Sequence, residues 1–244
     1  MRLTRVFVGQ PLAPGARVTL PESAGAHLVR VLRLREGESC VLFNGDGHDY
    51  DACLLSAGKR GVEAEVEAMR AVDNESPLRL VLLQGIARGE KMDLILQKAT
   101  ELGVAAIAPV FADRTEVRLD GERLEKRVAH WRSVVASACE QSGRARIPDL
   151  LPPRALAEAA ASLDTDALKL TLDPQGEHRF DTLSPVGVAG IVIGIGPEGG
   201  WSEKDRDILH ANGFSGLRLG PRVLRTETAG LAAIAALQAK FGDL

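Results

Sequence analysis

The sequence predicts an α/β protein with a small β-barrel domain at its N-terminal end. Residues 1–72 contain short apolar-polar alternations and turn signals, which are typical of strands, whereas strand and helix patterns alternate from Arg79 onward. Between the two parts, 73–77 reads Asp-Asn-Glu-Ser-Pro, which is polar and turn-prone. We therefore expect a first domain over 1–72 and a second domain over 73–244 with a parallel sheet.

Composition limits the class of protein. The chain has 244 residues, of which 45% are hydrophobic, so it can bury a sizeable core. No apolar run has the length of a membrane span, and the N-terminus lacks the apolar block of a signal peptide. Cys40, Cys53 and Cys139 are widely spaced and form no metal-binding motif, so we expect no disulfide framework, no zinc site and a location in the reducing cytoplasm. The net charge of −3 means that any polyanion must bind to a local patch.

Strands dominate the first part. Val41–Gly47 and His48–Leu55 read as a hairpin whose turn is Asn44–Gly47. Over 62–66, Val and Ala alternate with Glu, which predicts a half-buried strand.

A short helix with a basic stripe is expected between the first strand and the hairpin. Leu28, Val31 and Leu32 would share one of its faces, at helical spacing. Any single arginine of the stripe is more simply explained as a solvated side chain. However, several basic residues gather early in a slightly acidic chain, which favours a local polyanion-binding surface: Arg2, Arg5, Arg30, Arg33 and Arg35.

The second part begins with a βαβ unit. Its predicted elements are a strand over Arg79–Ala87, a helix over Lys91–Gly103, a strand over Val104–Ala112, a long helix over Glu122–Gln141, a short helix over Leu156–Leu163 and a strand over Ala167–Thr171. Trp131 is expected to be a core residue of the long helix rather than a base-stacking platform. The polar residues Glu140, Gln141, Ser142, Arg144 and Arg146 at its end either line a cleft or form a solvated terminus.

A glycine loop follows the apolar strand pattern Ile191–Ile195. Gly194–Gly199 satisfies the G-x-G-x-x-G pattern of dinucleotide-binding proteins. Pro197 removes a backbone donor, and Glu198 would place a carboxylate against phosphates. We therefore expect a ligand with hydroxyl, amino or positively charged groups, bound mainly by the backbone of the loop.

The last elements are two helices with a short strand between them. Ser202–Asp205 reads as a capping box that starts a helix ending at Gly213, and a strand is expected near Leu217–Leu219. Thr226 is the expected N-cap of the final helix, Glu227–Lys240. This helix is apolar nearly all round, so it should be buried in a core or against another subunit.

Five blocks of the sequence resemble one known family: HLVRVLRLREG, GEKMDLILQKATELGV, EQSGR, IGPEGGWSEKD and LGPRVLRTETA. On these blocks the chain resembles the bacterial 16S ribosomal RNA uridine-N3 methyltransferases known as RsmE, in the SPOUT superfamily. The blocks span nearly the whole chain, and the last two together are highly specific. Departures are small: Trp201 stands where the family often has phenylalanine, and Pro221 falls in the second glycine loop.

The resemblance implies a PUA-like RNA-binding barrel, an α/β domain with a C-terminal trefoil knot, and a homodimer. It implies that S-adenosylmethionine binds in the loops of the knot. The residues carried over by motif are Thr171, Leu172, Gly194, Ile195, Gly196, Pro197, Glu198, Gly199, Gly200, Leu217, Leu219, Gly220, Leu224, Thr226, Glu227, Thr228 and Ala229. The implied substrate is 16S ribosomal RNA in the small ribosomal subunit.

Arg225 is the predicted catalytic residue. Methylation at N3 of a uridine requires loss of the imide proton, and a guanidinium beside the uracil oxygens would stabilise the anion. An ion pair with Glu227 or Glu198 is the alternative role for Arg225. Glu227 lies in the first turn of a helix, where the dipole weakens a base, so we assign it to structure or cofactor orientation. Glu198 would bind ligand groups or cap loop amides, and no catalytic metal is expected.

Given this resemblance, the early arginines are predicted to contact RNA phosphates, together with four residues of the second domain: Arg88, Lys91, Arg114 and Arg144. Three alternatives remain open at this stage. They are methylation of another RNA such as tRNA, a nicotinamide-dependent enzyme built on the glycine loop, and a non-catalytic RNA-binding assembly factor.

Overall fold

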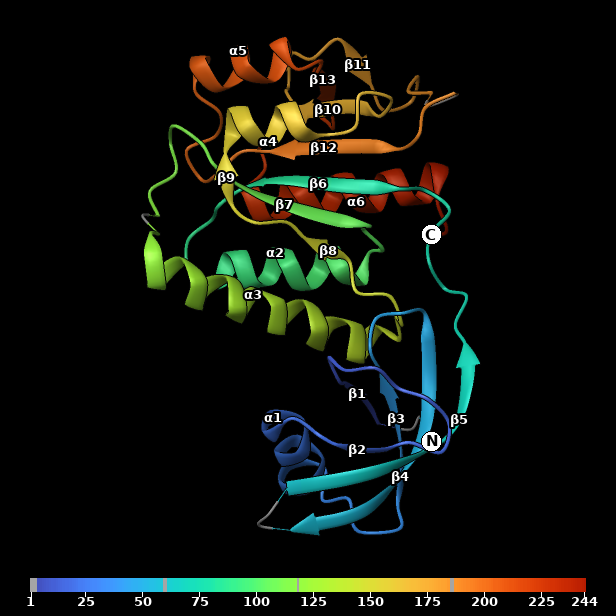
Figure 1. Ribbon diagram of the computed structural model, residues 1–244. Coiled ribbons are helices and arrows are strands. Elements are labelled where there is room, and N and C mark those ends of the chain that lie inside the picture. The colour runs from blue at the N-terminus through green and yellow to red at the C-terminus, as the bar shows by residue number, and fades with distance from the viewer. Residues whose placement is uncertain (1–3, 59–60, 118, 185–186) are drawn as a thin grey trace. The chain divides into compact units, whose positions relative to one another are not determined.

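The computed structural model describes residues 4–58, 61–117, 119–184 and 187–244 (Figure 1). Contacts divide the chain into two compact units. Unit 1 comprises Met1–Glu75 and Ala136–Ile147, and unit 2 comprises Ser76–Val135 and Pro148–Leu244. The segment Ala136–Ile147 thus belongs to unit 1, although it follows the predicted boundary at residue 72 by a long stretch of chain.

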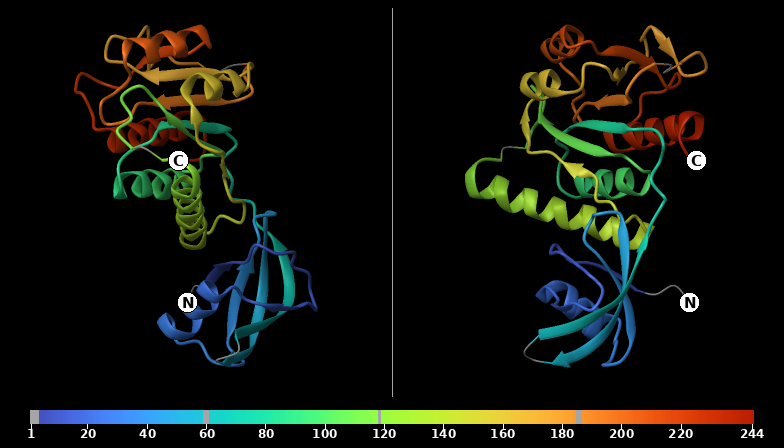
Figure 2. Two further views of the ribbon diagram at one scale, coloured as in Figure 1. Left: turned by 60° about the vertical axis from the view of Figure 1, so that its left-hand side comes forward. Right: turned by 45° about the vertical axis from the view of Figure 1, so that its right-hand side comes forward.

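Unit 1 is built on a five-stranded sheet with the order β1-β3-β4-β5-β2. Its strands are β1 (Arg5–Phe7), β2 (Arg17–Thr19), β3 (Ser39–Phe43), β4 (His48–Gly58) and β5 (Gly61–Ala71). Within the described part of this sheet, β1 and β3 pair in parallel and the other pairings are antiparallel. The predicted hairpin is confirmed as β3 and β4, and the alternating burial over 62–66 is confirmed in β5. Figure 2 shows β4 and β5 as long curved strands, and β-bulges interrupt their pairing.

The helix between β2 and β3 differs from the prediction. Helix α1 (Glu22–Ala26) continues into a π-helical turn, η1 (His27–Val31). Leu28 is fully buried, but Val31 is 65% exposed and Leu32 is 40% exposed, so the expected shared apolar face is wrong. The backbone N–H of Leu32 donates to the carbonyl oxygen of His27, five residues earlier. Because this wider turn holds more than 3.6 residues, side chains three and four positions apart no longer lie on one face.

Unit 2 is organised around an eight-stranded sheet in which every described pairing is parallel. Its order is β11-β13-β10-β12-β6-β7-β8, and β9 also pairs with β7 (Figure 1). The strands are β6 (Leu80–Gly85), β7 (Ala106–Phe111), β8 (Asp149–Leu150), β9 (Arg154–Ala155), β10 (Leu168–Leu172), β11 (His178–Arg179), β12 (Ile191–Ile195) and β13 (Ser215–Arg218). The predicted βαβ unit and parallel sheet are confirmed.

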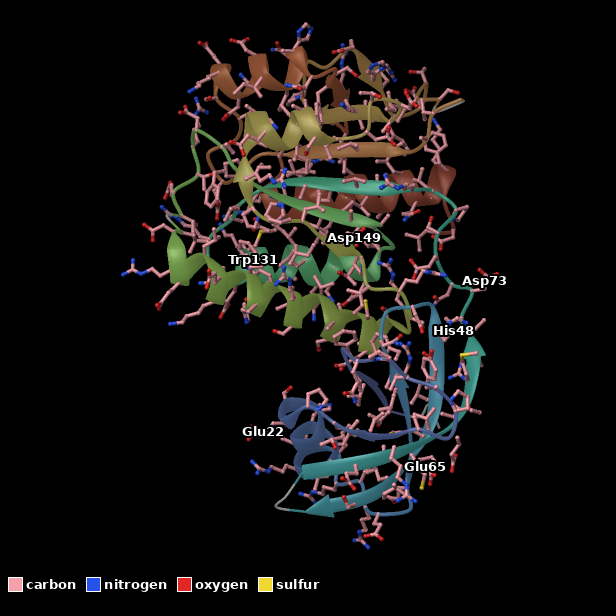
Figure 3. All side chains as sticks on the ribbon, in the orientation of Figure 1. Glu22, His48, Glu65, Asp73, Trp131 and Asp149 are labelled. Atoms are coloured by element: carbon pink, nitrogen blue, oxygen red, sulfur yellow. The ribbon has the colours of Figure 1, made fainter. Side chains whose placement is uncertain are left out.

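The helices of this part of the chain lie on both sides of the sheet (Figure 1). They are α2 (Glu90–Glu101), α3 (Gly121–Ser142), α4 (Leu156–Ser162), α5 (Glu203–Ala211) and α6 (Thr226–Phe241). The end of α3, from Ala136, belongs to unit 1. Val81 and Val192 share a buried cluster with residues of α4 and α5, whereas α6 contacts β12 and α2 and lies behind the strands in Figure 1. Trp131 of α3, labelled in Figure 3, is buried, which confirms it as a core residue. No helix in the described part of the chain is long and apolar enough to cross a membrane.

The starts of α5 and α6 test two predicted caps. The Ser202 hydroxyl accepts from the backbone N–H of Asp205, whose carboxylate accepts in turn from the N–H of Ser202, so the capping box is confirmed. Thr226 is not the N-cap of α6, because Arg225 occupies that position. The Thr226 hydroxyl instead donates to the carbonyl oxygen of Gly196 at 2.6 Å.

Candidate functional site

A pocket of about 480 Å³ lies in unit 2 where β10, β12 and β13 end. The carboxyl ends of parallel strands meet at one edge of a sheet, and the loops that follow them can surround a ligand. Three loop segments line the pocket, within 171–174, 194–201 and 217–229, together with Arg206 of α5. This is the part of the fold in which the sequence predicts a backbone-bound ligand.

Most of the predicted cofactor-binding residues line this pocket. They are Thr171, Leu172, Gly194, Ile195, Gly196, Pro197, Glu198, Gly199, Gly200, Leu217, Leu219, Gly220, Leu224, Thr226 and Ala229. Glu227 and Thr228 are not among the residues that line it. The structure therefore brings together three loops that are far apart in sequence, and their contact with a cofactor stays a prediction.

The glycine loop turns back on itself with little room. A Cβ at Gly196 would lie 3.0 Å from the backbone of Gly200 and Trp201, and Gly200 has a φ of 65°. A Cβ at Gly85, at the end of β6, would lie 2.5 Å from the backbone N of Pro197. Because side chains at these glycines would collide with main chain, the loop can present its backbone closely to a ligand.

Glu198 is held at the tip of the glycine loop by groups at the start of α2. Its Oε1 accepts from the backbone N–H of Arg88 at 3.0 Å and from Nζ of Lys91 at 3.3 Å. Partial burial raises the pKa of the Glu198 carboxyl, but these hydrogen bonds and the charge of Lys91 outweigh it, and the pKa lies below its ordinary value. The carboxylate thus stays ionised. Of its two predicted roles, accepting from a backbone amide is the one seen here, with Arg88 as the donor.

Three cations that the sequence predicts as RNA contacts surround the same tip. Arg88 pairs with Glu116, Lys91 pairs with Glu198, and Nη1 of Arg114 donates to the carbonyl oxygen of Gly199 at 2.9 Å. Arg88, Lys91 and Arg114 are partly or fully exposed, so their remaining N–H donors face solvent beside the pocket.

Arg225 is exposed at the N-cap of α6 and lines the pocket. Its guanidinium makes no hydrogen bond or ion pair with any residue that the structure describes, so the alternative pairing with Glu227 or Glu198 does not occur. Oε2 of Glu227 is buried and has no hydrogen-bond partner among the described residues. Of the two charged residues considered for catalysis, Arg225 is the one with access to the pocket.

Several residues that line the pocket were not singled out as site residues from the sequence, although the last two lie within the loop 217–229 that the resemblance implies: Asp173, Pro174, Trp201, Arg206, Arg222 and Val223. Two of them carried a usable signal. Asp173 follows a predicted strand, and Arg222 lies between residues carried over by motif. Arg206 gave none, because only the fold shows that the first turn of α5 borders the pocket.

The early arginines separate into two groups. Arg30, Arg33 and Arg35 are exposed, in agreement with an outward-facing basic surface on unit 1. Arg5 is instead buried in an ion pair with Asp49, so its prediction as a phosphate contact is wrong in this structure. Arg2 lies outside the described residues.

The EQSGR block belongs to unit 1, and none of its residues lines the pocket described above. Arg144 is buried and pairs with Glu75, so it too is unavailable as a phosphate contact. Glu140 accepts from the backbone N–H of Phe7 at 2.9 Å, and the carbonyl oxygen of Gly143 accepts from Asn74. Burial raises the pKa of Glu140, and that hydrogen bond opposes the rise.

Comparisons with known proteins cover the whole chain. A family described as the RNA methyltransferase domain matches residues 74–238, and an RNA methyltransferase PUA domain matches residues 20–67. The ribosomal RNA small subunit methyltransferase E of Buchnera aphidicola (from Schizaphis graminum) is 31% identical over 243 residues, covering 100% of this chain and 98% of that protein.

Two solved structures match over 100% of both chains. One is a putative methyltransferase from Legionella pneumophila in complex with S-adenosylmethionine, with a TM-score of 0.95 and 38% identity. The other is a ribosomal RNA small subunit methyltransferase E from Neisseria gonorrhoeae bound to S-adenosyl methionine, with a TM-score of 0.91 and 40% identity.

Proposed function

Because the chain belongs to the RNA methyltransferase family that includes the ribosomal RNA small subunit methyltransferases E, we propose that it methylates N3 of a uridine in 16S ribosomal RNA, using S-adenosylmethionine. The observation that carries the proposal is the pocket at the ends of β10, β12 and β13, which collects both glycine loops of the sequence. We place the reaction in the cytoplasm, on the small ribosomal subunit or its RNA.

The pocket has the size and chemistry for this cofactor. Its volume of about 480 Å³ lies in the range of small-molecule sites. Backbone groups of 194–200 and 217–220 would hold the polar edges of the molecule, and the apolar side chains of Leu172, Leu217 and Leu219 would cover its flat ring. When bound, S-adenosylmethionine supplies a methyl group activated by the positive sulfonium.

Arg225 carries the catalytic part of the proposal. The imide N3 of uracil has no free lone pair until its proton leaves, and the resulting charge spreads onto the two ring oxygens. A guanidinium without a carboxylate partner can donate to those oxygens and stabilise the anion, an effect typically worth about a hundredfold in rate or more. The loops that hold both reactants in register add the advantage of alignment.

We also propose the finer architecture of the protein. Residues 1–72 form a PUA-like RNA-binding barrel, and residues 73–244 form a SPOUT methyltransferase domain whose C-terminal part is a trefoil knot. The strand order β13-β10-β12 supports this topology, because the chain leaving β12 passes over β10 before α6 returns to β12. The middle of α6 supports a homodimer, since it carries four half-buried apolar residues: Leu231, Ala232, Ala235 and Ala236.

The test is methyl transfer from radiolabelled S-adenosylmethionine to small ribosomal subunits from a strain that lacks this protein, followed by nucleoside analysis. Wild-type protein should yield 3-methyluridine, and R225A should lower the rate by about a hundredfold while cofactor binding stays intact. R179A is a matched control, because Arg179 of β11 pairs with Asp181 and does not line the pocket.

Other outcomes would replace the proposal. Label in tRNA and none in the ribosomal subunit would assign a different RNA substrate. RNA binding and cofactor binding without any labelled nucleoside would assign an assembly factor. Nicotinamide binding without a response to S-adenosylmethionine would assign the dinucleotide reading of the glycine loop.

A further inference from the structure

A threonine hydroxyl fixes the first carbonyl of the glycine segment Gly194–Gly196. Oγ1 of Thr171, at the end of β10, donates to the carbonyl oxygen of Gly194 at 3.1 Å. Oγ1 of Thr171 in turn accepts from Nε1 of Trp201 at 2.9 Å, and Trp201 is only 6% exposed. A hydroxyl has one proton and two acceptor lone pairs, so the indole N–H leaves the proton of Thr171 directed at the glycine.

The same arrangement recurs on the other side of the segment. Oγ1 of Thr226, the first residue of α6, donates to the carbonyl oxygen of Gly196 at 2.6 Å and accepts from Nε2 of Gln84 at 3.2 Å. Gln84 lies near the end of β6 and is fully buried. Its Nε2 also donates to the carbonyl oxygen of Gly85 at 2.8 Å, which fixes the orientation of the amide.

We propose that Trp201 and Gln84 are positioning residues of the cofactor pocket, each acting through a threonine hydroxyl on one glycine carbonyl. The inference rests on the proposed function, because it takes the ligand to be S-adenosylmethionine. The two relays set the peptide planes that follow Gly194 and Gly196 before the ligand arrives. A loop that is already ordered does not pay its ordering entropy on binding, so the relays raise affinity.

The relays also define what the two threonines do. Each hydroxyl proton is committed to a glycine carbonyl, so neither hydroxyl donates to a ligand. Thr171 and Thr226 therefore serve the pocket through the backbone that they hold. Serine at either position keeps the relay, whereas valine keeps the shape and removes it.

The experiment measures S-adenosylmethionine binding by isothermal titration calorimetry on the full chain. W201F keeps an aromatic ring in the pocket but removes the N–H donor together with part of the indole ring system. Q84M keeps the length of the side chain and removes the amide. Each should weaken binding about three- to tenfold, the usual effect of one neutral hydrogen bond. T171V should match W201F, T171S should bind like the wild type, and adding W201F to T171V should cost nothing further.

Kinetics separate positioning from catalysis. The loop meets the cofactor in the ground state and in the transition state alike, so KM for S-adenosylmethionine should rise with Kd while kcat stays within about twofold. W131F is the matched control, because the buried Nε1 of Trp131 has no hydrogen-bond partner among the described residues. Removing that N–H should leave cofactor affinity unchanged.

Several results would overturn the inference. One is wild-type affinity in W201F and Q84M, including the case in which their thermal stability falls, because that assigns a purely structural role. Another is additive losses in W201F and T171V. If Q84M does not fold, the double-mutant cycle of W201F and T171V alone tests the inference. Failure of the wild type itself to bind S-adenosylmethionine would instead refute the proposed function.

Discussion

The buried ion pair between Arg5 and Asp49 gives a quantitative prediction for unit 1. Oδ1 of Asp49 accepts from Nη2 of Arg5 at 2.6 Å and from Nε at 3.2 Å, and each side chain is 5% exposed. Oδ2 of Asp49 also pairs with Arg70 at 2.8 Å. Asparagine at position 49 preserves the shape but turns an amide group toward the guanidinium of Arg5, which stays charged and buried.

The expected cost follows from what Arg5 keeps. Removing one partner of a buried ion pair typically costs about 3–5 kcal/mol, because the other charge is left uncompensated. Arg5 still donates to the carbonyl oxygens of Cys139 at 2.8 Å and Arg144 at 3.2 Å and lies 4.6 Å from the centre of the Phe43 ring. We therefore expect the lower end, about 3 kcal/mol, or slightly more than a hundredfold in the opening equilibrium of unit 1.

Native-state hydrogen exchange of β3 to β5, read by mass spectrometry, measures this change locally. D51N is the control. Asp51 pairs with Arg70 at 3.5 Å, but its side chain is 40% exposed, and an exposed pair contributes less than about 1 kcal/mol. A double variant with Met at position 5 and Leu at position 49 should recover most of the loss. Equal loss of protection in D49N and D51N, or no recovery in the double variant, would refute the reasoning.

Two further predictions concern unit 1. Tyr50 is the single tyrosine, and its hydrogen bond to Asp46, together with burial and the charge of that carboxylate, raises its pKa to about 12. An absorbance titration should therefore show tyrosine ionising late. D46N should lower this pKa toward 10, whereas the control D51N should leave it unchanged. Since the folded-state pKa lies above the unfolded one, this contribution to stability is complete below pH ~10 and lost as the pH rises toward 12. Replacing Arg30 and Arg33 with alanine should reduce the salt dependence of RNA binding by about two units of slope at most, with unchanged cofactor affinity, and an unchanged slope in filter binding would contradict their role.

The regular elements of unit 2 were predictable because their signals are local. The apolar period of α2, the capping box of α5 and the β-branched run of β12 each lie within a few residues. The two-residue strands β8, β9 and β11 carry no such pattern. They exist because the edge of the sheet offers them backbone partners, which no local sequence pattern records.

The π-helical turn marks a second limit of local patterns. Leu28, Val31 and Leu32 match an α-helical face, yet only Leu28 is buried. A π-turn forms when packing rewards one extra residue per turn, and here Leu28 enters the core of unit 1 while Arg33 takes a positive φ of 58°. The turn thereby leaves Val31 and Leu32 exposed beside the basic residues Arg30 and Arg33.

The arginines show most clearly what the sequence alone could not decide. Arg5 and Arg30 look alike in the sequence, as single basic residues beside apolar ones. The fate of Arg5 depends on Asp49, 44 positions later, and on carbonyl groups of 139 and 144, which only the fold brings to it. A charge can be buried only where several distant groups satisfy it together, so burial of a charge is a property of the tertiary structure.

Arg225 is the converse case. Glu227 and Glu198 were the partners considered for it from the sequence, but Glu198 is held by Lys91 and the backbone of Arg88. That competition leaves the guanidinium of Arg225 available to the pocket.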